Sequence, residues 1–381
     1  MGRKTKNGVV TAQIMVNLEV KNKMSVAQFA ILVTAAMFGG QIIGLPSKLV
    51  PQAEQFAWVS IILGGGLFFA AAWLMLKLGE LYPDCDYTEY LPRLLGKWPG
   101  LAVIGGFIGL FLIVSWANLS QFSQALTFFM FDRTPSDVVI MGMLGVVVYC
   151  ALQDLGTIIR VVEFNFFVAT LMMGTIWLLG IFNFQPENML PFWTDKPLGM
   201  VKGAIDIWGV YGGYEIILLF FPLINKEKGS LTLALAAAIA FVVVTSVIIV
   251  VFTVGVLTVE GVKSESYPTL VVVRSVELPG TFIERLENYL LVAWIPSIFK
   301  TLAIFVYICS QTLAKLWGFA DHRPWVLALT PVIFTGATLL NGPELMKLTD
   351  QVLTWLGLAL SVGIMPVVYL LAKRRRRSSV R

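Results

Sequence analysis

The chain has 381 residues, of which 13% are charged and 57% are hydrophobic. A soluble domain carries about 25% charged residues, so this composition excludes a soluble enzyme. The apolar residues also gather in long runs, which excludes a disordered chain. The run Leu231 to Leu257 is almost unbroken, whereas the strands of a membrane barrel alternate in polarity. The sequence therefore predicts an all-α integral membrane protein.

Hydropathy and turn signals predict ten membrane helices, since each span takes about 20 apolar residues. Residues 1–23 are expected to form a polar cytoplasmic tail, retained because no cleavage pattern follows it. Residues 24–372 are expected to form the membrane domain and residues 373–381 a basic cytoplasmic tail. The helices are expected near Val26–Val50, Phe56–Leu78, Gly100–Phe131, Ser136–Leu152, Thr157–Phe182, Gly199–Ile224, Leu231–Leu257, Phe282–Leu316, Pro324–Asn341 and Val352–Ala372.

Basic residues are divided unevenly between the two sides of the predicted membrane domain. The side that holds the N-terminus collects 19 Lys and Arg and the other side eight, with Lys300 inside a span. The positive-inside rule therefore places both termini in the cytoplasm, in agreement with an even number of spans. The run Lys373–Arg377 is interpreted as a stop signal whose charge also suits contact with anionic lipid.

Ten spans divide into two halves of five with opposite topology, which is the inverted-repeat plan of many secondary transporters. The first helix of each half is interrupted at membrane depth. The first break contains Gly39, Gly40, Gln41, Gly44 and Pro46. These residues disfavour a regular helix. The sequence therefore predicts a LeuT-like fold in which helices 1 and 6 are discontinuous.

The second break lies in the sixth span and contains Tyr211, Gly212, Gly213, Tyr214 and Glu215. Unwound backbone is tolerated in a membrane only where protein buries it or where it lines a cavity. Freed amides at one half-helix end bind carboxylates, and freed carbonyls at the other bind ammonium groups or cations. The paired breaks thus predict a central site for a small zwitterion. The alternative is that these glycines serve close helix packing.

Two charged residues are expected to lie deep in the membrane. Glu215 follows the second break, where it either faces a ligand, holds a proton or caps the half-helix. Lys300 follows Pro296 in the eighth span, and a desolvated lysine there could replace a bound sodium ion or carry a proton. The alternative for Lys300 is a side chain that extends to the membrane interface.

Span three carries a polar stripe on one helical face, formed by Ser115, Asn118 and Gln121 at three-residue spacing. The stripe either lines an aqueous path or forms hydrogen bonds with neighbouring helices. The three cysteines and the single histidine follow no metal-binding spacing, so no metal or cofactor is expected. No nucleophile–base pair is evident, which argues against an enzyme, and the basic residues are topology signals rather than a nucleic-acid surface.

Three stretches of the chain resemble the spore germination permease family, the B subunits of GerA-type germinant receptors in the amino acid/polyamine/organocation transporter superfamily. The resemblance extends over nearly the whole chain and leaves only the tail before Met24 outside it. The stretches are Gly39–Pro46, Gly212–Glu215 running on to Phe221-Pro222, and Tyr267–Phe299, which includes Pro268-Thr269-Leu270, Arg274, Glu277, Gly280, Phe282–Glu287 and Trp294.

This resemblance implies a ten-helix permease-like subunit in the inner membrane of a bacterial endospore. It also implies partnership with a larger A subunit and a lipoprotein C subunit, and recognition of a small nutrient such as an amino acid. In that scheme Gly39, Gly40, Tyr211, Gly212, Gly213 and Glu215 would surround the ligand. The sequence departs from the family at Gln41, where a small residue is usual. A bulky amide in the break either narrows the pocket or adds a hydrogen bond.

Three functions agree with these observations. The first is a germinant receptor subunit that binds a nutrient at the two breaks and triggers germination. The second is a proton-coupled amino acid transporter with Glu215 or Lys300 as the proton carrier. The third is an ion or water conduit that opens during germination and is lined by the polar stripe.

Overall fold

The computed structural model describes residues 23–131, 133–191, 193, 196–225, 229–275, 286–340 and 342–379. Within these residues the structure contains helices and one isolated β-bridge, and it has no strand. Several expectations fall outside the described residues. They concern the tail up to residue 22, Lys226 and Lys228, residues 276–285 of the family stretch, and Asn341.

The first five predicted spans correspond to helices that the structure places in the same order. The first span is split into α2 and α3, and α5 is a short helix between spans two and three. The bounds are α2 Val26–Met37, α3 Leu45–Ala53, α4 Ala57–Leu81, α5 Tyr87–Leu95, α6 Lys97–Phe129, α7 Ser136–Ala151 and α8 Leu155–Gly180.

The second five spans repeat this plan, again with a split first member. Span six consists of α9 and α10, and span ten consists of α15 and α16. The short helix α12 precedes span eight. The bounds are α9 Pro197–Asp206, α10 Ile217–Phe220, α11 Leu231–Ser264, α12 Pro268–Ser275, α13 Leu286–Leu316, α14 Arg323–Leu339, α15 Pro343–Leu358 and α16 Met365–Ser379.

The described helices have the length and composition of membrane spans. Six helical stretches are long and apolar enough to cross a bilayer, and a seventh span is formed if the pair around the second break, bent by 50°, is counted as one. The shorter apolar helices α2 and α7 complete spans one and four, and the 17-residue α14 lies at the ninth predicted position. The all-helical membrane fold with two discontinuous spans is thereby confirmed.

Local sequence signals explain where several helices begin. Ser25 and Gln28 form a reciprocal capping box at the start of α2. Asp86 caps α5 by accepting a hydrogen bond from the Thr88 amide, and Ser230 caps α11 in the same way through the Leu233 amide. These caps satisfy amide groups that have no partner inside the helix.

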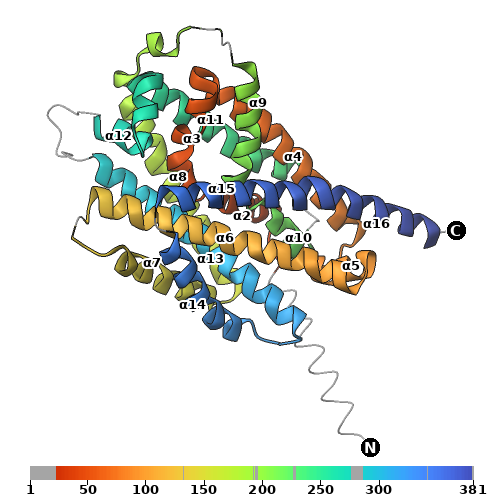
Figure 1. Ribbon diagram of the computed structural model, residues 1–381. Helices are drawn as coiled ribbons and strands as arrows, with labels where there is room; N and C mark the ends of the chain where they lie inside the picture. Colours follow the sequence, from red (N-terminus) through yellow and green to blue (C-terminus); the bar gives the residue numbers. More distant parts are fainter. Residues whose placement is uncertain are drawn as a thin grey trace, which may run out of the picture.

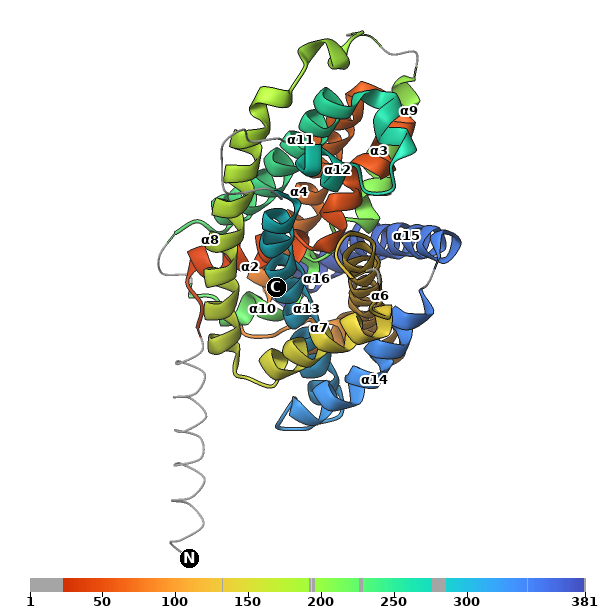
Figure 2. The ribbon, with the colours of Figure 1, turned by 90° about the vertical axis from the view of Figure 1, so that its left-hand side faces the viewer.

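The two broken spans lie in the interior of the bundle. α2 contacts α11, α8 and α13, and it meets the 3₁₀ turn Tyr214–Ile216 that follows the second break. Figures 1 and 2 show α6 running alongside α15, with α7 and α14 on the side of the bundle away from α3 and α9. The breaks are therefore surrounded by protein on several sides, as unwound backbone in a membrane requires.

One end of the bundle joins the start of the first span to the end of the sixth. The Met24 amide donates to the Leu223 carbonyl and the Asn225 amide to the Met24 carbonyl, both at 2.9 Å. These two bonds form a parallel bridge between Met24 and Ile224. The start of span one and the end of span six are thus held together by backbone hydrogen bonds.

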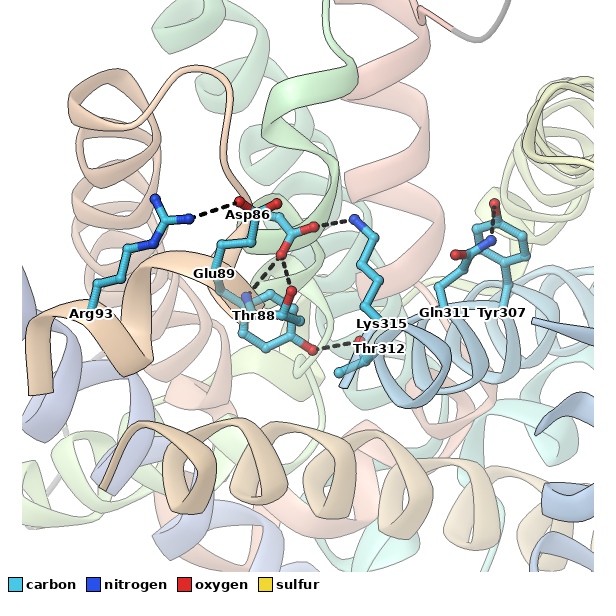
Figure 3. A network of polar contacts seen from close by, with 9 residues as sticks. Asp86, Thr88, Glu89, Arg93, Tyr307, Gln311, Thr312 and Lys315 are labelled. Atoms are coloured by element: carbon cyan, nitrogen blue, oxygen red, sulfur yellow. Dashed lines mark hydrogen bonds and ion pairs between the residues drawn. The ribbon is translucent and has the colours of Figure 1, made fainter. Parts of the chain in front are cut away.

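The same region contains a buried carboxylate, Asp86, which links α5 to the end of α13 (Figure 3). Asp86 accepts hydrogen bonds from the Thr88 amide at 2.8 Å and the Thr88 hydroxyl at 2.5 Å, and it forms an ion pair with Lys315. Next to it, the Tyr87 hydroxyl lies 2.8 Å from the Thr312 hydroxyl. α5 is therefore fastened to the eighth span by a small polar network.

The opposite end of the first span is also tied to its neighbours. Lys48 on α3 forms a 2.8 Å ion pair with Asp350 on α15, and Gln52 donates to Asp206 on α9 at 2.8 Å. Glu54 follows α3 and pairs with Lys196 at 2.7 Å. Both ends of the structure are consequently bridged by polar contacts.

The last helix differs from its predicted bounds. α16 continues through Lys373 to Ser379, and the Arg375 guanidinium donates to the Arg93 carbonyl on α5 at 2.5 Å. Before it, residues Ala359–Ile364 form a π-helical segment between α15 and α16. Such a segment displaces the helical register by one residue and is frequent at functional sites.

Candidate functional site

The first break lies between α2 and α3, at Phe38–Gly44. α2 ends at Met37, Phe38 leaves helical geometry with φ −93° and ψ 71°, and Gly40–Gly44 form a 3₁₀ turn. Gly39, Gly40 and Gly44 are all buried. The backbone of Gln41 belongs to the turn, and its side chain lies outside the described part of the structure.

The polar stripe of α6 faces this break. The Asn118 carboxamide oxygen accepts a 2.7 Å hydrogen bond from the Gly40 amide, and a Cβ added to Gly44 would lie 2.7 Å from the Gln121 amide nitrogen. Ser115 instead donates to the Phe111 carbonyl of its own helix. All three stripe side chains are buried. In this structure Asn118 thus connects span three to the break, and Gln121 lies beside Gly44.

Residues of α12 and α13 satisfy the carbonyls that the first break leaves free. Thr301 donates to Ala35 at 2.7 Å, Trp294 donates through its indole to Gly40 at 3.2 Å, and Thr269 donates to Ile43 at 2.9 Å. Sequence reasoning did not assign these three residues to the site. Trp294 and Thr269 lie in the family stretch, which was the available signal, whereas Thr301 is distinguished only by its position next to Lys300.

The second break follows α9 and contains Gly213, whose φ of 137° is in a region that favours glycine. Glu215 closes this break. One of its carboxylate oxygens accepts from the Gly213 amide at 2.7 Å, and the other accepts from the Ser361 hydroxyl at 3.3 Å. Glu215 is 2% exposed, and Ser361 belongs to the π-helical segment. The carboxylate thus caps the break and connects span six to span ten.

The two breaks touch each other. A Cβ added to Gly213 would lie 2.6 Å from the Ala36 carbonyl oxygen at the end of α2. By contrast, a Cβ on Gly212 would have Val114 of α6 as its nearest neighbour, at an ordinary contact distance of 3.8 Å. The space beside Gly212 therefore adjoins span three and is not filled by backbone.

The two tyrosines of the second break lie in an aromatic cluster. The rings of Trp208, Tyr211 and Tyr214 pack around Phe68 of α4, with centroid distances of 4.7, 5.7 and 6.0 Å. The Tyr211 hydroxyl donates to Ser246 on α11. The Tyr214 hydroxyl is buried next to the side chains of Trp208, Glu215 and Ser361. The hydroxyls of both tyrosines therefore lie among protein groups of the break.

Lys300 lies on α13, one residue before Thr301, and is 1% exposed. Its ammonium lies 3.4 Å from the Ser297 hydroxyl and 5.6 Å from the centre of the Phe38 ring, which directly precedes the first break. Among the described residues no carboxylate forms an ion pair with it. Its side chain thus remains inside the protein and does not extend to an interface.

Most of the predicted site residues converge in space. The two breaks, the stripe and Lys300 come from spans one, three, six and eight, and α15–α16 adds Ser361. Within the described residues no group of three or more His, Cys, Asp or Glu side chains could hold a metal ion. The arrangement gathers break amides and carbonyls, the Glu215 carboxylate and the Lys300 ammonium inside the bundle, where neighbouring protein groups bond the amides and carbonyls.

Two interrupted spans at corresponding positions of two five-helix halves define the LeuT-like fold. A solved structure of a Na⁺-coupled sialic acid symporter, in a substrate-bound outward-open state, superimposes with a TM-score of 0.63. It covers 89% of this chain and 79% of that one at 12% identity, and therefore shows the shared fold alone. Residues 23–346 match the spore permease family, described as spore germination proteins. The chain belongs to this family.

Curated relatives agree with that assignment. The spore germination protein YndE of Bacillus subtilis is 28% identical over 93% of this chain and 98% of its own length. Spore germination protein A2 of the same organism is 26% identical over 93% and 97%, and GerLB of Bacillus cereus is 20% identical over 91% and 93%. The family predicted from the three sequence stretches is thus confirmed, as is the multi-pass membrane location.

Proposed function

We propose that this chain is the membrane subunit of an endospore germinant receptor and that it binds a small zwitterionic nutrient, such as an amino acid, between the two breaks. The observation that supports the proposal is the contact between the breaks, where Gly213 lies against Ala36. Next to this contact, Asn118 accepts a hydrogen bond from the Gly40 amide, and Glu215 accepts one from the Gly213 amide. A ligand that enters here exchanges bonds with both discontinuous spans at once.

The side chains that form hydrogen bonds with the two breaks indicate how a ligand would be recognised. The Gly40 amide now donates to Asn118, so a ligand carboxylate can take the place of the carboxamide oxygen. Glu215 offers the single buried carboxylate of the break region, and a ligand ammonium can pair with it. The space beside Gly212 would complete the pocket. Gln41 belongs to the backbone turn of the first break, and its amide would either narrow the pocket or add a hydrogen bond to the ligand.

The proposed signal is a change in how the broken spans are attached. Binding would loosen the bond between Gly40 and span three and the bond between Glu215 and Ser361 of span ten. A ligand shifts such an equilibrium only by its difference in affinity for the two arrangements. The conformational change would be transmitted to an A subunit and a lipoprotein C subunit in the inner membrane of the endospore. Both termini of this chain would lie in the cytoplasm.

The substitution Gly212→Ala tests the site because the structure has room for the added methyl group. We expect the nutrient concentration for half-maximal germination to rise by about tenfold while the protein level in spores stays normal, since one extra methyl group in a fitted pocket costs about 1–3 kcal/mol of binding free energy. Gly105→Ala on α6 is the matched control, because an added Cβ at that glycine has no neighbour within 4 Å and at Gly212 it meets only Val114, at 3.8 Å. An unchanged dose response for Gly212→Ala would contradict the proposed site.

A second candidate, proton-coupled transport of an amino acid, is favoured by one observation. Lys300 is buried beside the first break without a carboxylate partner among the described residues, on a fold shared with an ion-coupled symporter. The Lys300→Met protein, reconstituted in liposomes, would then lose accumulation of labelled amino acid driven by a pH gradient. If neither the wild-type protein nor the variant accumulates the amino acid, transport is excluded and the receptor function remains.

A further inference from the structure

A cavity next to the first break has Lys300 in its wall. The cavity has a volume of about 140 Å³ and lies between α2, α8, α11 and α13. Its lining contains no Asp or Glu. Apart from Lys300, the lining residues on which the argument depends are Phe38, Phe166, Trp177, Phe241 and Thr245.

The cavity wall has more hydrogen-bond donors than acceptors to receive them. The Lys300 ammonium has three donors, and the only oxygen within reach among the described residues is the Ser297 hydroxyl, at the long distance of 3.4 Å. The indole N–H of Trp177 is buried with no partner among the described residues. Thr245 uses its hydroxyl hydrogen on the Phe241 carbonyl at 2.7 Å. A ligand that accepts hydrogen bonds and carries negative charge would satisfy these groups.

The remaining walls are apolar and aromatic. The Phe241 ring lies 5.2 Å from the Phe166 ring and 6.4 Å from the Phe38 ring, measured between centroids. A dry protein cavity of about 150 Å³ holds one benzene molecule. The space beside Lys300 therefore suits a ligand of roughly six or seven non-hydrogen atoms with a short apolar chain.

We infer that this cavity is a binding site for a small monocarboxylate with a short apolar chain, whose carboxylate pairs with Lys300. An α-amino group is disfavoured, because it would place a second positive charge beside Lys300 where the lining has no acidic residue. The ligand class thus differs from the zwitterion proposed for the breaks. Because Phe38 forms part of the wall and directly precedes Gly39, an occupant would also fix the end of α2 at the first break.

Calorimetric titration of the full-length protein in nanodiscs tests the inference. The probe is 3-methylbutanoate at neutral pH, and it is compared with 3-methylbutanamide, its neutral isostere. We expect saturable binding of the carboxylate and an affinity for the amide at least about tenfold weaker, because the amide has no charge to pair with the Lys300 ammonium. Absence of saturable carboxylate binding, or equal affinity for the amide, would overturn the inference without any variant.

Two lysine variants then locate the site. Lys300→Met keeps the length of the side chain and removes the ammonium, so carboxylate affinity should fall by at least about tenfold. Lys347→Met, on the exposed face of α15, removes the same charge elsewhere and should leave the affinity unchanged. Unchanged affinity in Lys300→Met, with a thermal unfolding transition like that of the wild type, would show that the carboxylate binds in another place. These results are independent of the Gly212→Ala dose response, so either proposal can fail alone.

Discussion

Gly213 and Ala36 hold the two broken spans in direct contact. The backbone of Gly213 passes so close to the end of α2 that a Cβ on it would lie 2.6 Å from the Ala36 carbonyl oxygen. Its φ of 137° is also unfavourable for any other residue. The glycine at this position is thus required both by its own conformation and by its neighbour.

Gly213→Ala should therefore destabilise the protein, whereas Gly212→Ala should not. A residue forced into an unfavourable backbone region costs about 1–3 kcal/mol, and the clash with Ala36 adds to that cost. At Gly212 the added methyl group meets Val114 at 3.8 Å. Thermal unfolding of the purified proteins in one detergent measures the difference. Equal midpoints for the two variants would show that the breaks do not touch as described.

Asn118→Leu should weaken the fold because it leaves the Gly40 amide without its acceptor. A buried donor that loses its partner costs about 1–3 kcal/mol. Ser115→Ala on the same helix face is the control, since Ser115 bonds only to its own helix and its loss should change stability by less than about 0.5 kcal/mol. Unfolding midpoints that fall equally in both variants would contradict a specific role for Asn118.

Glu215→Gln and Glu215→Ala separate capping from proton transfer. A glutamine retains an oxygen for the Gly213 amide, so the fold should be kept. Alanine leaves both Gly213 and Ser361 unpaired and should cost about 2–3 kcal/mol, in the range of hydrogen bonds to charged groups. If Glu215 carries a proton, the glutamine variant is stable and yet inactive in a gradient-driven uptake assay. If Glu215 is a cap alone, the glutamine variant behaves like the wild type in both assays.

Asp86→Ala should destabilise the protein more than Lys315→Met. Asp86 is buried and caps α5 through Thr88, and loss of such a cap costs about 0.5–2 kcal/mol. Lys315 is 46% exposed, so its ion pair is screened by solvent and contributes about 1 kcal/mol or less. Unfolding at low and high salt measures both effects. The loss caused by Lys315→Met should shrink at high salt, whereas the part of the Asp86→Ala loss that comes from the helix cap should remain. A larger loss for Lys315→Met would contradict this ranking.

The sequence was sufficient to predict the spans and the breaks because both depend on local composition. Long apolar runs need no tertiary contact to be recognised, and glycine clusters at membrane depth are informative by themselves. The three-residue spacing of Ser115, Asn118 and Gln121 placed these side chains on one face of α6. The spacing could not show that this face meets Gly40 and Gly44, because that contact joins residues 78 positions apart in the case of Asn118 and Gly40.

The residues that form hydrogen bonds with the breaks could not be predicted from sequence either, because these contacts also join distant parts of the chain. Thr301 and Ser361 are common residues in apolar helices, and only the three-dimensional arrangement brings them to Ala35 and Glu215. The π-helical segment that contains Ser361 has no composition that distinguishes it from an α-helix. Nor could sequence reveal the cavity beside Lys300, whose walls come from four helices.

The bridge between Met24 and Ile224 has a mechanical consequence. Two backbone hydrogen bonds join these residues, so a pull on the chain before Met24 acts on the end of span six as well as on the start of span one. A displacement of Met24 therefore moves the start of span one and the end of span six together, and a force that reaches Met24 acts on both broken spans at once.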